Sequence, residues 1–188
     1  MTVTTLDRNT ALIVVDLQIG IVGATFIHPI AEVVRRARAL IDAFRANSLP
    51  VVLVNVSGSA PGRTERPPRS REPFPPGWTD FVPELCQQSS DIVVTKRTWG
   101  AFASTDLEHR LKALGVTQVV VIGVATGTGV ESTARQAYEC GLNVALAVDA
   151  MTDGRSESHE YSIKHVFPRL GETGTAQDII DLLGTRRT

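Results

Sequence analysis

Short apolar runs alternate with amphipathic stretches along most of this chain. The apolar runs lie at 11–18, 50–56, 91–97, 119–122 and 143–148. Unbroken runs rich in β-branched residues are typical of strands buried on both faces of a parallel sheet. A weaker sixth run lies near 170–173, and the helical patterns between the runs indicate repeated β-α-β units. The pattern therefore predicts an α/β fold built on a mostly parallel sheet.

The helical stretches carry their own boundary signals. A threonine followed three residues later by glutamate is a capping-box pattern, and it predicts helices that begin at Thr105 and Thr128. Apolar residues at helical spacing predict the remaining helices, over 29–44, 156–167 and 175–183.

The stretch from Val119 to Tyr138 joins a strand to a helix through a glycine-rich elbow. Gly123 is expected to end the strand, and Thr128 is expected to begin the helix. The first amides of a helix lack internal partners and carry a partial positive charge. The elbow is therefore expected to favour an anionic substrate group or a developing oxyanion.

Two strands end on charged residues. The apolar part of the first run stops at Asp16, and the third run delivers Lys96. Ligands of open parallel sheets bind outside the carboxyl ends of the strands, where the strand order reverses. An acid–base pair is one interpretation of these residues. A structural ion pair at the rim of the sheet is the other, and spacing alone does not choose between them.

A long segment from Ser57 to about Asp80 has no periodicity and is rich in Pro, Gly and Arg. Loops of this length in a compact domain are typically lids or binding loops. Its apolar residues Phe74 and Trp78, with the following Phe81, are unusual for a solvated segment. We therefore expect a homodimer or a higher homo-oligomer.

Composition narrows the class of protein. The 188 residues are 43% hydrophobic and 21% charged, which fits a single domain over 1–188. A formal net charge of -1 without basic runs argues against a nucleic-acid partner. The first apolar run is too short for a signal peptide or a membrane span. Cys86 and Cys140 lie far apart, which favours reduced thiols in a cytoplasmic protein.

Four segments together resemble the isochorismatase-like hydrolases. They are DLQ at 16–18, KRTWGAF at 96–102, GVATGTGVESTARQAYECG at 123–141 and VALAVDAMTD at 144–153. The resemblance spans residues 11 to about 184. It implies a three-layer sandwich, Rossmann-like, with six strands and helices on both faces. It also implies an active site of Asp16, Lys96 and position 129, with a cis peptide bond between Val124 and Ala125.

Position 129 holds glycine, where the cysteine hydrolases of the family carry their nucleophile. Cys140 lies about 16 Å further along the helix, and Cys86 precedes the third strand, so neither thiol replaces it. In having glycine at this position, the chain resembles the true isochorismatases. These enzymes hydrolyse a vinyl ether without a covalent nucleophile. Asp16 would be the general acid, although Lys96 should lower its pKa.

The residues expected to bind substrate are less similar to those of isochorismatases. Val56 stands where the isochorismatases carry glutamine, and Ala125 stands where they carry an aromatic residue. The expected substrate-binding residues are Gln18, Trp99, Phe102, Val124, Ala125 and Thr126. Gln18 is also compatible with capping a strand end, and both aromatic residues with the core. Basic residues are available in the long loop at Arg63, Arg66, Arg69 and Arg71.

No cofactor and no metal are expected. GTGVES at 127–132, with Asp149 further on, resembles a dinucleotide fingerprint, but Ser132 replaces its third glycine. The four histidines have no ligand spacing and are expected to be solvated or to cap helices: His28, His109, His159 and His165. The resemblance to the isochorismatase-like hydrolases, with Gly129 in place of the cysteine, implies hydrolysis of a small, anionic metabolite. The alternatives are a non-catalytic small-molecule binding protein and a C–N hydrolase relative that has lost its nucleophile.

Overall fold

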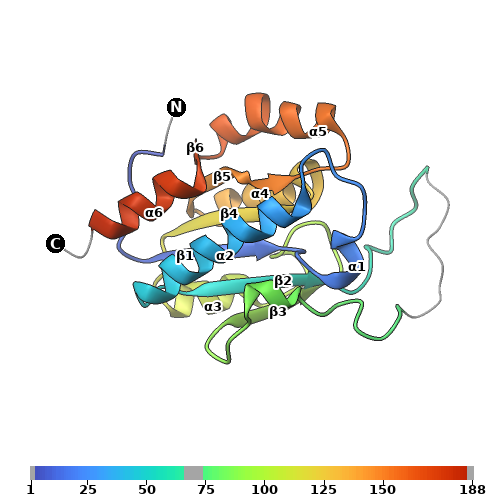
Figure 1. The fold of residues 1–188 in the computed structure, drawn as a ribbon, viewed down its shortest axis with the longest axis horizontal. Helices are drawn as coiled ribbons and strands as arrows, with labels where there is room; N and C mark the ends of the chain where they lie inside the picture. Colours follow the sequence, from blue (N-terminus) through green and yellow to red (C-terminus); the bar gives the residue numbers. More distant parts are fainter. Residues whose placement is uncertain (1–2, 66–73, 186–188) are drawn as a thin grey trace.

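Six parallel strands form the centre of the molecule. The computed structural model describes residues 3–65 and 74–185, and neighbouring strands pair in parallel throughout. Their spatial order is β3-β2-β1-β4-β5-β6 (Figure 1). The strands are β1 (Thr10–Val15), β2 (Val51–Val56), β3 (Ile92–Lys96), β4 (Gln118–Val124), β5 (Asn143–Thr152) and β6 (Glu172–Gly174).

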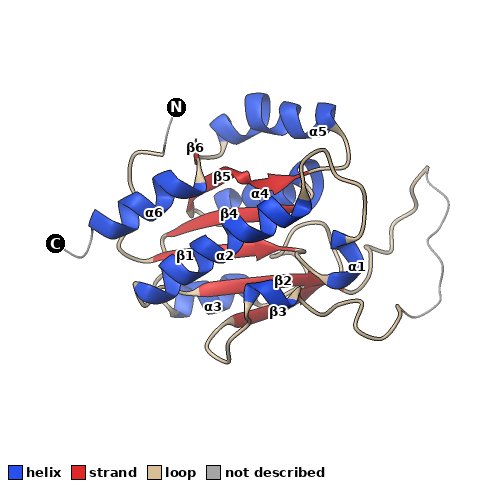
Figure 2. Ribbon diagram, viewed as in Figure 1, coloured by secondary structure: helices blue, strands red, loops and turns tan. Residues whose placement is uncertain are grey.

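Helices cover both faces of the sheet (Figure 2). α2 (Ile30–Ala46) and α6 (Ala176–Gly184) pack on one face, and α3 (Leu107–Ala113) and α4 (Glu131–Glu139) pack on the other. The predicted three-layer α/β sandwich is thus confirmed. No helix of the described residues is long and apolar enough to cross a bilayer. The shorter helical segments are α1 (Ile19–Val22), η1 (Pro83–Leu85), η2 (Thr126–Val130), α5 (Ser156–Tyr161), η3 (Ser162–Val166) and η4 (Phe167–Arg169).

The position of β1 explains its unbroken apolar sequence. Leu12 and Val14 lie in the core beneath α2 and α6, whereas Ala11, Ile13 and Val15 lie in the core beneath α3 and α4. Side chains alternate between the two faces of a strand, so a strand covered on both faces must be apolar at every position.

The strand order reverses at β1. This strand pairs with β2 on one side and with β4 on the other. At its carboxyl end, Val15 lies beside Val54 of β2 and Gly123 of β4. A crevice at such a reversal is the usual ligand site of an open parallel sheet. The residues at the carboxyl ends of β1, β3 and β4 are therefore the candidates for a functional site.

β4 and β5 extend further than their apolar runs indicated. Gly123 does not end β4, which continues to Val124, and β5 continues to Thr152. Gly123 has a φ of 115°, and a Cβ atom there would lie 2.1 Å from the carbonyl oxygen of Val15. Only glycine fits this close approach of two backbones. The register of β4 on β5 also shifts between Val121 and Gly123.

The capping box predicted at Thr105 is wrong. α3 begins at Leu107 without a side-chain cap. The carboxylate of Glu108 instead lies 2.6 Å from Nζ of Lys112. The hydroxyl of Thr105 accepts a hydrogen bond from the N–H of Leu107 and donates to the carbonyl of Ala101. It therefore joins the preceding loop to the first residue of the helix, without the reciprocal bond from Glu108 that a capping box requires.

The capping box predicted at Thr128 is also wrong. A π-helical turn, η2, precedes α4, and α4 begins at Glu131 without a side-chain cap. The Glu131 carboxylate lies 2.9 Å from Nε of Arg135 and accepts a hydrogen bond from Ser162. At Glu131 and at Glu108, a cation four residues later competes with the cap for the carboxylate. A true capping box occurs at the start of α6, between Thr175 and Asp178.

The long loop has no helix or strand over 57–65 and 74–80. Arg66, Arg69 and Arg71 lie outside the described residues, and Arg63 is exposed. The aromatic residues at its end pack partly on their own chain. The rings of Phe74 and Trp78 stack at 3.9 Å, Trp78 lies directly over Gly20, and Phe81 packs against the core beneath α2. These contacts weaken the reason for expecting an oligomer.

Candidate functional site

Asp16 and Lys96 form a buried ion pair at the carboxyl edge of the sheet. Nζ of Lys96 lies 2.7 Å from Oδ2 of Asp16. Asp16 directly follows β1 in the left-handed conformation, with a φ of 53°, and its N–H donates to the carbonyl of Val54. Lys96 is the last residue of β3. The structure thus brings together the two charged residues that the sequence placed at strand ends.

Burial dominates the electrostatics of this pair. Asp16 is 6% exposed and Lys96 is 2% exposed. Desolvation raises the pKa of Asp16 to about 6, although the charge and hydrogen bond of Lys96 act to lower it. Burial therefore outweighs Lys96 in its effect on this pKa. At pH 7 about one tenth of a carboxyl group with such a pKa carries its proton.

One oxygen of Asp16 is left without a protein partner. Oδ1 is buried and accepts no hydrogen bond from the described residues, whereas Oδ2 accepts from Lys96. Nζ of Lys96 also donates to the carbonyl of Thr98 at 3.3 Å, which fixes the ammonium group. A buried polar atom without a partner is costly, and such atoms often mark a functional site. Oδ1 is therefore the oxygen of this carboxylate that keeps its hydrogen-bonding capacity unused among the described residues.

Gly129 lies directly against the Asp16 carboxylate. A Cβ atom at position 129 would be 3.2 Å from Oδ2 of Asp16, 3.1 Å from the carbonyl oxygen of Val124 and 3.0 Å from Cγ1 of Val15. Asp16, Lys96 and position 129 therefore meet in space, as the family resemblance implied. Because residue 129 has no side chain, the elbow presents backbone and no nucleophile to Asp16.

Three backbone N–H groups of the elbow have hydrogen-bond partners within the protein. The N–H of Gly127 donates to Oδ2 of Asp153 at 2.8 Å, and those of Thr128 and Val130 both donate to the carbonyl of Ala125. The prediction of a first helical turn with unpaired amides is therefore wrong for Thr128 and Val130. The peptide bond between Val124 and Ala125 is cis.

The other residues expected to bind substrate differ in how deeply their side chains are buried. The side chains of Val124 and Thr126 are fully buried, and Ala125 is half-buried. Phe102 is buried in the core beneath α3 and α4, whereas Trp99 is 67% exposed. For Phe102 the structure thus matches the alternative interpretation, that of an ordinary core residue.

Both polar atoms of the Gln18 side chain form hydrogen bonds with backbone groups. Its Oε1 accepts from the N–H of Val56, and its Nε2 donates to the carbonyls of Val56 and Trp78. Gln18 is fully buried. It therefore joins the chain after β1 to the end of β2 and to the long loop, which is the strand-end role that its position also allowed.

Two polar residues of α4 attach the loop after Lys96 to the elbow. The hydroxyl of Thr133 donates to the carbonyl of Gly129 at 2.7 Å and accepts from the N–H of Ala101. Oε1 of Gln136 accepts from the N–H of Phe102. The sequence reasoning missed both residues. Their signal was a pair of hydrogen-bonding side chains three residues apart on α4, which therefore lie on the same face of the helix.

His159 was also missed, since it was expected to be solvated or to cap a helix. The structure corrects this, because His159 is 7% exposed and its Nδ1 lies 2.8 Å from the hydroxyl oxygen of Thr126. No spacing rule joins residues 33 positions apart. His28, His109 and His165 are exposed. Among the residues that the structure describes, no group of three or more His, Cys, Asp or Glu side chains is arranged to hold a metal ion.

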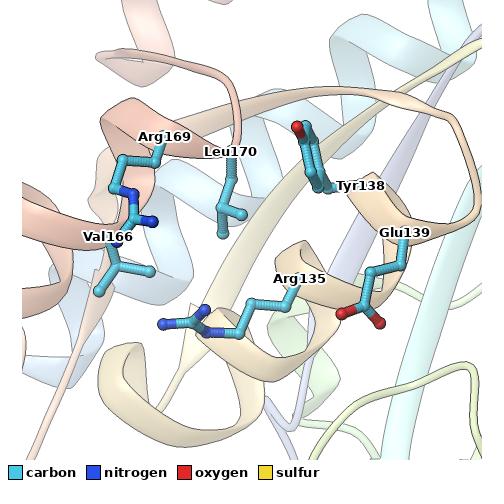
Figure 3. Close-up of a pocket in the computed structure, with 6 residues that line it drawn as sticks. All are labelled: Arg135, Tyr138, Glu139, Val166, Arg169 and Leu170. Carbon is cyan, nitrogen blue, oxygen red and sulfur yellow. The ribbon is translucent and has the colours of Figure 1, made fainter.

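Two surface hollows lie away from Asp16 and Lys96. One of about 250 Å³ lies between α4 and the segment around η4 (Figure 3). A larger one shares Tyr138, Glu139 and Leu170 with it and is also lined by Gln118 and Asn143, the first residues of β4 and β5. Both hollows therefore belong to the amino ends of the strands, whereas Asp16 and Lys96 lie at the carboxyl ends.

Sequence and structure comparisons agree on one family. The family model described as isochorismatase domain matches residues 10–178. The uncharacterized isochorismatase family protein YecD of Escherichia coli O157:H7 is 40% identical over 182 residues, which are 94% of this chain and 97% of that protein. The corresponding protein YwoC of Bacillus subtilis is 38% identical over 93% of this chain and 94% of its own length.

A solved structure shows the same fold. An isochorismatase family protein from Burkholderia thailandensis is 39% identical, with a TM-score of 0.91 over 96% of this chain and 98% of that one. Family model, relatives and fold all extend across the strand ends that carry Asp16, Lys96 and Gly129. The chain therefore belongs to the isochorismatase family of hydrolases.

Proposed function

We propose that this hydrolase cleaves a vinyl ether in a small, anionic metabolite of the isochorismate type, without a covalent cysteine intermediate. One observation carries the proposal. A carboxyl group with a raised pKa keeps Oδ1 free while Lys96 holds Oδ2, and the residue in contact with it is glycine. This arrangement favours proton donation over covalent attack.

The reaction begins with proton transfer. Asp16 donates its proton from Oδ1 to the terminal carbon of the enol ether, which leaves an oxocarbenium ion. Water adds to this cation and loses a proton, and the resulting hemiketal breaks its C–O bond to give a ketone and an alcohol. Lys96 keeps the new Asp16 carboxylate in place and stabilises its charge. Asp16 then regains a proton from solvent.

The elbow supports substrate binding in this proposal. Its backbone around Val124, Ala125 and Thr126 forms one side of the site, next to Asp16. Trp99, which is exposed, lies at the rim, and Phe102 supports the same loop from the core. A basic residue of the long loop, with Arg63 as the described candidate, would bind the substrate carboxylate.

The thiols of the chain favour this chemistry over amide hydrolysis through cysteine. Cys86 is exposed, and its backbone is left-handed at the end of η1. Burial and the neighbouring Glu108 raise the pKa of Cys140, which disfavours its reactive thiolate. A C–N hydrolase that lost its nucleophile would keep the fold and the ion pair, and it would not turn over amides through either thiol.

Isochorismate turnover tests the proposal. Purified protein should release pyruvate from isochorismate, and Asp16→Asn should lower kcat by about 100- to 10,000-fold. Asp106→Asn is the matched control, because Asp106 is an exposed carboxylate paired with Arg110. Full activity in Asp16→Asn would contradict the role of Asp16. Tight binding of isochorismate without turnover by the wild-type protein would favour the binding-protein alternative.

A further inference from the structure

Two histidines lie beside the elbow, on the far side from β1. His159 of α5 is buried, and its Nδ1 lies 2.8 Å from the hydroxyl oxygen of Thr126. The ring of His28 meets the ring of His159 edge to face, with centroids 4.9 Å apart. Nδ1 of His28 lies 3.2 Å from the hydroxyl oxygen of Thr152, at the end of β5. The two imidazoles thus connect three separate segments to the elbow.

The same cluster holds two consecutive residues of the elbow. His159 contacts Thr126, and Oδ2 of Asp153 accepts from the N–H of Gly127 at 2.8 Å. The carbonyl of Asp153 in turn accepts from the N–H of Ile27, next to His28. His159 and Asp153 therefore contact Thr126 and Gly127, which immediately follow the Val124–Ala125 pair in the proposed substrate site.

We propose that His159 is a positioning residue that holds the elbow against Asp16 through Thr126, and that protonation of His159 loosens this hold. This inference rests on the proposed function for its catalytic consequence. Its structural part, the coupling between the histidines and the elbow, stands on the contacts alone.

The chemistry of imidazole gives the direction of the effect. Neutral His159 offers Nδ1 to the Thr126 hydroxyl as donor or acceptor, depending on the tautomer. The neighbouring His28, with its ring centroid 4.9 Å away, opposes a positive charge on His159, and a buried imidazolium also loses hydration. The elbow itself contributes only the neutral hydroxyl of Thr126. Proton uptake therefore acts against the packed arrangement.

The charged groups that face His159 shift its pKa in opposite directions. Burial lowers the pKa of His159 most, and the charge of His28 lowers it further, whereas Asp153 and Glu160 act to raise it. The net direction is downward. His159 is consequently neutral at neutral pH, and it takes up its proton only in more acidic solution than an ordinary histidine.

Two opposing titrations would then shape the activity. Asp16 must be protonated, which favours acidic solution, whereas His159 must be neutral, which favours less acidic solution. A bell-shaped dependence of kcat/KM on pH follows, with Asp16 responsible for the basic limb and His159 for the acidic limb.

Nuclear magnetic resonance tests the coupling without any substrate. In ¹⁵N-labelled protein, the amide signals of Thr126 and Gly127 should shift with the same midpoint as the ring nitrogens of His159. His28→Gln, a change at an exposed residue, should raise that midpoint, because it removes a positive neighbour. His109→Gln is the control, since His109 is exposed on α3, and it should leave the midpoint unchanged.

The outcomes separate the two proposals. Amide signals of Thr126 and Gly127 that ignore the His159 titration, or a His159 midpoint unmoved by His28→Gln, would overturn the inference. Should isochorismate be turned over, His28→Gln must also move the acidic limb of kcat/KM to higher pH, and an unmoved limb would overturn the catalytic part. Failure of turnover with intact coupling would instead count against the proposed function alone, leaving the structural role of His159 supported.

Discussion

Gly129 and Asp16 lie so close that a single added carbon on the glycine would sit 3.2 Å from the carboxylate. Because residue 129 has no side chain, it leaves room beside the Asp16 carboxylate and places no reactive group there. Any side chain introduced at position 129 must push Val15 or the Val124 carbonyl by a few tenths of an ångström. Position 129 is for this reason a direct probe of the site.

Gly129→Cys should create a reactive thiol. Lys96 lies beside the same carboxylate and lowers the pKa of a neighbouring cysteine, while Asp16 serves as its base. Iodoacetamide should modify the new thiol faster than Cys86 or Cys140, as measured by peptide mass spectrometry. Asp16→Asn in the same background should slow the reaction. A thiol no more reactive than the native pair would show that the site is misplaced, as would loss of wild-type activity on alkylation of Cys86 or Cys140.

The pH dependence of kcat/KM should report Asp16. Its pKa is raised to about 6, so the protonated acid predominates below that pH, and activity should fall about tenfold per unit above it. Lys96→Met removes the group that acts to lower this pKa, and it should move the basic limb to higher pH. Lys112→Met is the control, because Lys112 is exposed and pairs with Glu108. A limb that stays in place in Lys96→Met would rule out Asp16 as the titrating group.

The two charges of the ion pair should be needed together. Removing one partner leaves the other buried and unpaired, so Asp16→Asn or Lys96→Met should each lower the free energy of unfolding by about 3–5 kcal/mol. Changing Glu108→Gln in the exposed pair with Lys112 should have a much smaller effect, because both of its charged groups are solvated. Urea unfolding monitored by circular dichroism measures both. Equal, small losses at the two pairs would mean that the Asp16–Lys96 pair is not desolvated.

Thr133 should control the distance between the elbow and the loop after Lys96. Thr133→Val removes the hydroxyl that donates to Gly129 and accepts from Ala101, at a cost of about 1–3 kcal/mol in the free energy of unfolding. We expect kcat to fall more than KM rises, because the catalytic groups are displaced. Thr133→Ser keeps the hydroxyl and should restore kcat. A serine variant as impaired as the valine variant would point to lost packing instead.

A homo-oligomer remains a prediction. Ile19 is 49% exposed and Phe74 is 39% exposed. Phe74 stacks on Trp78 near the end of the long loop, and Trp78 lies over Gly20, next to Ile19. Light scattering at micromolar concentration should give at least twice the mass of one chain, and Ile19→Glu should lower it. A monomer in the wild-type protein would show that the stacked rings of Phe74 and Trp78 are satisfied within one chain.

The sequence predicted the sheet well because burial on both faces leaves a local signature. Runs such as Val119–Ile122 read as strands without reference to the rest of the chain. The same reasoning placed Asp16 and Lys96 together, since the carboxyl ends of parallel strands share one edge of the sheet. The helices predicted over 29–44, 156–167 and 175–183 begin within one residue of their expected starts, whereas the two starts predicted from capping boxes at Thr105 and Thr128 are wrong. Thr105 and Thr128 fit the pattern, but Glu108 and Glu131 pair with cations four residues further along.

The sequence by itself determined the fold, the family and the absence of a nucleophile at position 129, because each depends on local residue types and their order. Only the tertiary structure decided the ionisation of Asp16, since burial and Lys96 act on its pKa in opposite directions. It likewise decided that Gln18 bonds backbone and that His159 reaches Thr126. Contacts between distant segments depend on how the loops pack, and no spacing within the chain records them.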